Sequence, residues 1–358
     1  MKKKVVSVLL CVAMVATMAA GCGSKKSETT DTEKKDTTAS SDLSVEIVAK
    51  GFQHDFWKAV KLGAEKAGTE FGAKINFVGP KDESAVAEQV EQLNNAINKK
   101  PSAICLAALD TDSVLGALDT AKSSNIPIIG FDSGVPEAED FIAANAATDN
   151  YAAGELAADK LYELIKDKVT DPKDTVRIGV VSQDATSQSI GDRTGGFVDK
   201  MVKLIGEDKA TVEGHDKYNK KVDGAKVVIE VGIPATVEDA ACVTVANTIL
   251  NKNDLVAVYG SNEFSAKNII TANESLQKLG ADKVIGIGFD SGEIQLNAIK
   301  DGIFAGSITQ DPVQIGYQAV TLAVKAAKGE SVSDVDTGCL WYTKDNMEDE
   351  NIAPCLYK

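Results

Sequence analysis

Histidine is scarce in this sequence: the 358 residues include two, His54 and His215. They lie far apart along the chain, and neither a CxxC nor an HExxH motif occurs. Structural and catalytic zinc sites need several such ligands at short spacings. A Walker A motif, a GxSxG motif and a catalytic Cys/His setting are missing as well. We therefore predict a protein that is not an enzyme, with no catalytic residue, no metal and no cofactor.

Basic residues are also in the minority. The chain has 38 Lys and Arg against 53 Asp and Glu, a formal net charge of −15. Nucleic-acid recognition requires a basic patch, and none is found in the part expected to fold, so we expect no nucleic-acid partner. The composition, 44% apolar and 25% charged, is that of a soluble globular protein, and the length fits about two domains.

The N-terminal apolar stretch is shorter than the roughly 20 residues that span a bilayer. Residues 1–21 combine three early lysines, this short apolar stretch and small residues at the end. That order is typical of a secretory signal peptide. The ending Ala19-Ala20-Gly21-Cys22 resembles the lipobox of bacterial lipoproteins, which implies cleavage before Cys22 and a lipid on its thiol. Ordinary secretion with cleavage nearby is the alternative.

Residues 22–42 have almost no apolar side chains and are rich in Ser, Thr, Lys and acidic residues. Such a segment cannot bury a core, so we predict a disordered tether. A lipid at Cys22 followed by a tether would hold the folded body on the outer, extracytoplasmic face of the cell membrane.

The body of the chain alternates between two periodicities. Helical spacing of apolar residues is seen, for example, at Trp57, Val60, Ala64, Ala67 and Phe71. Between such stretches lie short β-branched runs, a pattern that predicts βαβ units and parallel sheets. The predicted strands are 45–50, 75–79, 103–108 and 126–131 in a first run, and 176–181, 227–232, 255–260 and 283–289 in a second. Helices of the second run are predicted near 190–204, 237–251, 263–279 and 292–301.

The motif GFDSG occurs twice, at 130–134 and 288–292. Each copy ends the predicted fourth strand of its run and places an aspartate, Asp132 or Asp290, directly after it. Ligands of open α/β sheets bind at the carboxyl ends of the strands. Two similar domains would therefore bring one aspartate each to opposite walls of a cleft.

From about residue 43 to 345, the body resembles the type I substrate-binding proteins of sugar ABC transporters, above all the ribose-binding group. The resemblance rests on seven short motifs that occur in the same order. They are GFQHDFW (51–57), GFDSG (130–134), AATDN (146–150), ATSQSIGDRTGGF (185–197), GSNEFSA (260–266), GFDSG (288–292) and SITQDPVQIGY (307–317).

The resemblance implies two Rossmann-like lobes joined by a three-segment hinge, the type I periplasmic-binding-protein fold, in the α/β class. The N-terminal lobe would comprise 43–147 plus 311–338, and the C-terminal lobe 148–310 plus 339–358. It further implies a monomer that binds a sugar between its lobes and delivers it to ABC transporter permease subunits. A receptor that serves a sensor or a chemoreceptor would bind sugar in the same way.

The resemblance also implies a set of site residues. Aromatic rings would stack on the sugar, carboxylates would accept hydrogen bonds from its hydroxyls, and Arg, Asn and Gln would donate. The departures from the ribose-binding pattern are Ser133, where an Arg often stands, and Lys50, Gln53 and His54 in place of small polar residues. The expected ligand-binding residues are Lys50, His54, Phe56, Trp57, Asp132, Ser133, Arg193, Asn262, Asp290 and Gln310.

Other interpretations stay open at this point. Asp132 and Asp290 could cap the helices that follow, since Asp is a favoured N-cap residue. Phe56 and Trp57 could both belong to the core, and Arg193 could serve a structural ion pair. A glycosidase also uses two carboxylates across a cleft, although two matching FDSG settings suggest equal roles rather than an acid and a base. The lactose-repressor family shares the fold, but needs an N-terminal DNA-binding helix-turn-helix where this chain has a signal and a tether.

Six cysteines are present, of which Cys11 would leave with the signal peptide. Cys105 and Cys242 lie in apolar stretches and are predicted to be buried thiols. Cys339 and Cys355 could form a disulfide in an exported protein, or could both stay as free thiols.

Overall fold

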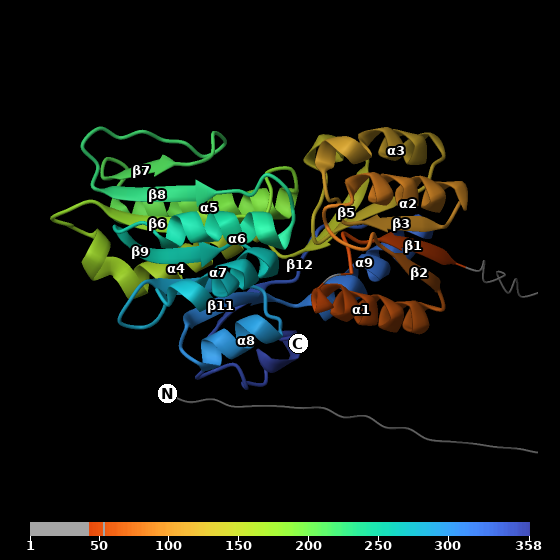
Figure 1. Ribbon diagram of the computed structural model, residues 1–358. Coiled ribbons are helices and arrows are strands. Elements are labelled where there is room, and N and C mark those ends of the chain that lie inside the picture. Colours follow the sequence, from red (N-terminus) through yellow and green to blue (C-terminus); the bar gives the residue numbers. More distant parts are fainter. Residues whose placement is uncertain (1–42, 53) are drawn as a thin grey trace, which may run out of the picture. The chain divides into compact units, whose positions relative to one another are not determined.

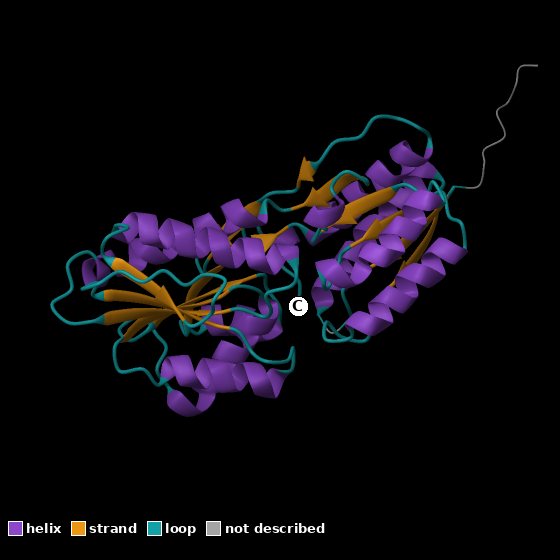
Figure 2. Ribbon diagram, turned by 90° about the horizontal axis from the view of Figure 1, so that it is seen from above, coloured by secondary structure: helices purple, strands orange, loops and turns teal. Residues whose placement is uncertain are grey.

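The computed structural model describes residues 43–52 and 54–358. The predicted signal peptide, the tether and the lipidation of Cys22 lie outside these residues. The described chain forms two sheets flanked by helices (Figures 1 and 2). No helix in the described part is long and apolar enough to cross a membrane.

The first lobe is built on a six-stranded parallel sheet with strand order β12-β5-β4-β3-β1-β2. Helices α1 and α9 cover one face and α2 and α3 the other (Figure 1). The strands are β1 Ser44–Val48, β2 Lys74–Val78, β3 Ala103–Leu106, β4 Ile128–Phe131, β5 Ile142–Ala147 and β12 Val335–Asp336. The helices are α1 Asp55–Phe71, α2 Val86–Asn98, α3 Thr111–Ser123, α9 Pro312–Ala327 and the 3₁₀ turn η1 Pro136–Ala138.

The second lobe has a seven-stranded sheet with order β13-β11-β10-β9-β6-β8-β7, parallel except for the edge strand β13, which pairs antiparallel with β11. Helices α4 and α5 pack on one face and α6, α7 and α8 on the other. The strands are β6 Val176–Val181, β7 Ala210–Glu213, β8 Val227–Gly232, β9 Leu255–Gly260, β10 Ile285–Phe289, β11 Phe304–Gln310 and β13 Cys339–Tyr342. The helices are α4 Asn150–Val169, α5 Gln188–Ile205, α6 Asp239–Leu250, α7 Glu263–Leu276, α8 Glu293–Lys300 and η2 Ala353–Cys355.

The chain passes between the two sheets three times. It leaves the first sheet after β5, returns after β11 to form α9 and β12, and leaves again to form β13. This is the three-segment hinge expected from the sequence, and the α/β fold with two parallel-sheet lobes is confirmed. The eight predicted strands are present with ends within two residues of the predicted ones.

One strand count was wrong. The short strand β7, in the polar stretch between α5 and β8, was not predicted, so β10 is the fifth strand of the second run rather than the fourth. Strands β5, β11, β12 and β13 were not predicted either. β5 (IAANAA) and β11 (FAGSITQ) consist mostly of small and polar residues and lack the longer β-branched runs that mark the other strands.

Two close helix crossings fix the helices that carry the site. Gly63 of α1 and Gly316 of α9 face the partner helix so closely that a Cβ at either would collide with its backbone. In the second lobe, Gly154 of α4 and Gly196 of α5 make the same kind of approach. Close packing at these glycines therefore holds α1 against α9 and α5 against α4, and α1 and α5 carry site residues in their first two turns.

Candidate functional site

A small cavity, here called the interlobe cavity, lies between the lobes at the carboxyl ends of the strands and has a volume of about 30 Å³. Nine of the ten expected ligand-binding residues line it. Ser133 does not, and three further residues do: Glu83, Ile190 and Glu263. A larger cavity of about 210 Å³ beside β10 and β11 contains none of the expected residues. The full lining is Lys50, His54, Phe56, Trp57, Glu83, Asp132, Ile190, Arg193, Asn262, Glu263, Asp290 and Gln310.

The two GFDSG aspartates have the same backbone conformation. Both lie in the left-handed region, with φ 56° at Asp132 and 70° at Asp290, where Asp is tolerated better than most residues. Each amide N–H donates to a carbonyl of the next strand, Asp132 to Ala146 and Asp290 to Ile308. Neither side chain caps a helix, because the N-cap positions of η1 and α8 are Val135 and Gly292, and neither helix has a side-chain cap. The helix-capping interpretation is therefore wrong for both.

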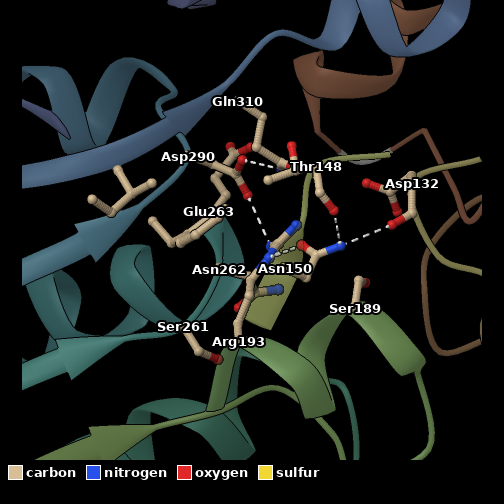
Figure 3. A network of polar contacts seen from close by, with 12 residues as sticks. Asp132, Thr148, Asn150, Ser189, Arg193, Ser261, Asn262, Glu263, Asp290 and Gln310 are labelled. Carbon is tan, nitrogen blue, oxygen red and sulfur yellow. Dashed lines mark hydrogen bonds and ion pairs between the residues drawn. The ribbon is translucent and has the colours of Figure 1, made fainter. Parts of the chain in front are cut away.

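The carboxylate of Asp290 is held by two partners (Figure 3). Gln310 Nε2 donates to its Oδ1 at 2.7 Å, and the Arg193 guanidinium lies 3.6 Å from its Oδ2. Burial raises the pKa of Asp290 to about 6, although the charge of Arg193 and the hydrogen bond from Gln310 oppose that rise. The Gln310 Oε1 atom is buried and has no hydrogen-bond partner among the described residues.

The carboxylate of Asp132 makes no hydrogen bond or ion pair with another described residue, in contrast to that of Asp290. Burial raises the pKa of Asp132, and the nearby charges of Lys50 and Arg193 oppose this shift. A buried carboxylate with its oxygens uncommitted is an acceptor for a ligand donor.

Arg193 connects the two lobes (Figure 3). Its Nε donates to Asn150 Oδ1 at 2.7 Å, and Asn150 Nδ2 donates to the carbonyl oxygens of Thr148 and Asp132. The guanidinium carbon lies 3.9 Å from the centroid of the Phe289 ring, a cation–π arrangement. Arg193 therefore lines the cavity and also makes an ion pair, with Asp290. Both of the roles considered for it are present together.

Lys50 lies two residues beyond the end of β1 and is 2% exposed. Its Nζ donates across the lobes to Ser187 Oγ at 2.8 Å and, at 3.5 Å, to Ser189 Oγ. Ser133 joins the same group, since its Oγ lies 3.3 Å from Ser187 Oγ and accepts from the Ser189 amide. The structure thus places Ser133 in an interlobe contact rather than in the cavity lining.

Glu83 follows β2 and holds Trp57 in place. Its Oε1 accepts from Trp57 Nε1 and its Oε2 from Gln183 Nε2, both at 2.9 Å. Gln183 Oε1 in turn accepts from Asn262 Nδ2 at 2.7 Å, while Asn262 Oδ1 caps α7. Burial raises the pKa of Glu83, but Lys50, His54 and the two hydrogen bonds outweigh it and lower the pKa overall.

Phe56 and Trp57 meet edge to face, with ring centroids 5.0 Å apart and an interplanar angle of 89°. Both are buried, and Trp57 also contacts Phe131 edge-on. They pack into the core of the first lobe and line the interlobe cavity at once, so the two interpretations of these rings do not exclude each other.

Glu83 and Glu263 were not among the expected site residues, because neither belongs to a repeated motif. Glu83 sits in the loop after β2, and Glu263 is the first residue of α7. Their position in the sequence was a usable signal, because both are acidic residues in the segment that follows a strand of a parallel sheet, Glu83 after β2 and Glu263 after β9. Within the described residues no cluster of three or more His, Cys, Asp or Glu is arranged to hold a metal ion.

The four cysteines in the described part are free thiols. Cys105 and Cys242 are buried, as predicted. Cys339 and Cys355 are unpaired, so the disulfide alternative is not realised and the free-thiol alternative is. Burial raises the pKa of both thiols to about 11.

Comparison with known proteins shows which family the chain belongs to. Residues 45–331 match the periplasmic binding protein domain. The chain belongs to this family. Curated members include the ribose import binding proteins of Haemophilus influenzae, 23% identical with 82% of this chain and 89% of the relative covered, and of Escherichia coli, 24% identical with 92% and 94% covered.

Solved structures similar to this chain share its fold over nearly their whole length. A Brachyspira murdochii protein described as an ABC transporter, LacI family transcriptional regulator, is 38% identical with a TM-score of 0.76, and 88% of this chain and 99% of the other are covered. An ABC transporter solute-binding protein of Agrobacterium vitis, solved with D-fucose, is 31% identical with a TM-score of 0.74 and coverages of 88% and 100%. Members of this family are binding proteins, and the chain is accordingly not an enzyme.

Proposed function

We propose that this protein is the extracytoplasmic substrate-binding protein of an ABC transporter and that it captures a monosaccharide in the interlobe cavity. The observation that carries the proposal is the pair Asp132 and Asp290, presented from opposite lobes into one cavity that Phe56 and Trp57 also line. Bound D-fucose in a 31% identical structure, and D-arabinose in one that is 29% identical, support the sugar class.

The chemistry of the lining suits a neutral polyol. Carboxylates accept hydrogen bonds from hydroxyls, and charge-assisted bonds are the stronger ones. Asp132 has both oxygens uncommitted, and Gln310 offers its Oε1. Lys50, Arg193, His54 and Asn262 supply donors, and the aromatic rings supply a surface for the C–H face of a sugar. Four lining carboxylates, those of Glu83, Asp132, Glu263 and Asp290, disfavour an anionic ligand.

The size of the cavity indicates that binding involves lobe movement. A volume of about 30 Å³ is room for one or two water molecules, and a sugar needs more. We propose that the bodies 43–147 plus 311–338 and 148–310 plus 339–358 open about the three-segment hinge, admit the sugar and close on it. The direct contacts between the lobes, such as Lys50–Ser187 and Glu83–Gln183, belong to the closed arrangement.

Delivery follows from the same proposal. The closed, sugar-loaded monomer would dock on permease subunits, and a lipid on Cys22 with the 22–42 tether would keep it beside them on the outer face of the membrane. A Cys22→Ser variant that stays in the membrane fraction would contradict the anchor. A sensor or chemoreceptor as the recipient is the alternative. If a permease knockout abolishes uptake of the bound sugar, the permease is the recipient; if uptake is unchanged, the alternative is favoured.

A thermal-shift panel of monosaccharides tests the binding proposal. At a free ligand concentration 100-fold above Kd, binding adds about 2.7 kcal/mol to the free energy of unfolding. We expect at least one neutral pentose or hexose to raise Tm and, in small-angle scattering, to compact the protein. Sugar acids and sugar phosphates serve as controls. A panel in which no sugar changes Tm would remove the proposal.

A further inference from the structure

The C-terminal tail is bound to the second GFDSG motif. The Tyr357 amide donates to Ser291 Oγ at 3.0 Å, and the Tyr357 carbonyl oxygen accepts from Ser291 Oγ and from the Gly292 amide. The Tyr357 ring lies 5.9 Å from that of Phe56, centroid to centroid, at an interplanar angle of 68°. A tail fixed to the second lobe therefore touches an aromatic residue of the first lobe.

The Tyr357 hydroxyl begins a hydrogen-bonded series that reaches a histidine. It donates to Glu263 Oε2 at 3.0 Å, and the other carboxylate oxygen, Oε1, lies 3.2 Å from His54 Nδ1. Glu263 is the first residue of α7 in the second lobe, and His54 stands at the N-cap position of α1 in the first. The carboxylate thus serves one group from the tail and one from the opposite lobe.

The other ring nitrogen of His54 has no such partner. His54 is 7% exposed and lines the interlobe cavity. Its Nε2 is buried without a hydrogen-bond partner among residues 43–52 and 54–358. Buried polar atoms in native proteins are nearly always satisfied. Because Nδ1 is engaged with a carboxylate, Nε2 is the atom left to meet a ligand.

We propose that Tyr357 and Glu263 are positioning residues that hold His54 as an imidazolium, whose Nε2–H donates to a hydroxyl of the bound sugar. This inference rests on the proposed function and adds to it the charge state and the donating atom of His54, together with a role for the C-terminal tail.

The charges around His54 favour the protonated ring. Burial alone would lower its pKa, but the hydrogen bond and the charge of Glu263, together with the charge of Glu83, raise it above the usual value, against the weaker effect of Lys267. Raised pKa values of this kind keep the ring charged further into the neutral range. The other charged or titratable groups near it are Lys50, Asp132, Arg193, Asp239, Asp290 and Tyr357.

The experiment follows the imidazole signals by NMR during a pH titration, with and without sugar. The chain has two histidines, so His215→Gln leaves His54 alone and also serves as the matched control. We expect Glu263→Gln to lower the pKa of His54, and Tyr357→Phe, which keeps the ring but loses the hydroxyl, to lower it by less. Sugar should raise the pKa of His54 in the parent.

The same variants are titrated calorimetrically across pH. The parent should bind sugar more weakly as pH rises through the pKa of His54, and in Glu263→Gln this loss should begin at lower pH, with Kd about tenfold weaker at pH 7. An unchanged His54 pKa in Glu263→Gln would overturn the positioning role. A parent that binds no sugar, but whose His54 pKa still falls in Glu263→Gln, would overturn the sugar-donor role and the sugar proposal while the positioning of the ring stands.

Discussion

Asp132 and Asp290 occupy equivalent places in the two sheets. Phe131 pairs with Ala146 and Phe289 with Ile308, and in each lobe the aspartate that follows the Phe donates its amide to the carbonyl of that same partner. The two differ in their side chains, because Gln310 and Arg193 hold the Asp290 carboxylate while that of Asp132 is uncommitted. The repeated motif therefore has the same backbone conformation in both lobes. The two carboxylates differ in how many of their oxygens are free to accept hydrogen bonds from a ligand.

Substitution at these two positions should reverse the usual order of Ala and Gly. Ala is normally the more stable of the two in folded proteins, but the left-handed conformation costs a non-Gly residue about 1–2 kcal/mol. We expect Asp132→Ala to be less stable than Asp132→Gly by about 1 kcal/mol, and the same at Asp290, measured by urea unfolding. Leu62→Ala and Leu62→Gly, on the exposed face of α1, are the control pair and should show the ordinary order.

Asp290 should make stability depend on pH in a predictable direction. Its folded-state pKa of about 6 is above the value of roughly 3.9 for an unfolded Asp, so the folded protein holds the proton more tightly. The stability contributed by the neutral carboxyl is fully present below about pH 4 and is lost as pH rises through about 6. Asp290→Asn lacks this loss. Without sugar, the free energy of unfolding of Asp290→Asn minus that of the parent should therefore rise between pH 4 and 7. A difference that stays constant over this range would contradict the assignment.

Lys50 should support Asp132 electrostatically. Removing its charge with Lys50→Met takes a cation away from the buried carboxylates of Asp132 and Glu83 and deletes the bonds to Ser187 and Ser189. We expect the pKa of Asp132 to rise further. As the pH is lowered, the variant should therefore begin to lose sugar affinity at a higher pH than the parent does. Lys58→Met, at an exposed lysine of α1, is the control. If the parent and Lys50→Met lose sugar affinity at the same pH on acidification, Lys50 does not act on Asp132.

Sequence alone predicted the parts of this structure that follow local rules. The β-branched runs that became β4 and β10 end in a motif that fixes both position and conformation of the aspartates, so the two opposed carboxylates could be foreseen. The resemblance implied that Asn262 and Gln310 belong to the site, and both line the interlobe cavity. The interlobe hydrogen bonds could not be, because Glu83 and Gln183 are 100 residues apart and no local pattern relates them. Tyr357 likewise reaches its partners only through the path of the tail.

The disulfide alternative shows a different limit. Cys339 and Cys355 are 16 positions apart, and an exported chain can oxidise such a pair. Their side chains, however, are set by β13, which pairs with β11, and by η2, whose Cys355 carbonyl accepts from Thr309. Spacing along the chain carries no information on that geometry.

Calorimetric titration of Asp132→Asn and Asp290→Asn with the best sugar of the panel tests the central claim most directly. Asn tolerates the left-handed backbone and keeps one acceptor oxygen, but loses the charge and the second acceptor. Hydrogen bonds to charged groups contribute about 1.5–3 kcal/mol, so we predict that each variant binds roughly 10- to 150-fold more weakly than the parent, with folding intact by circular dichroism. Parent-like Kd values in both variants would contradict the account.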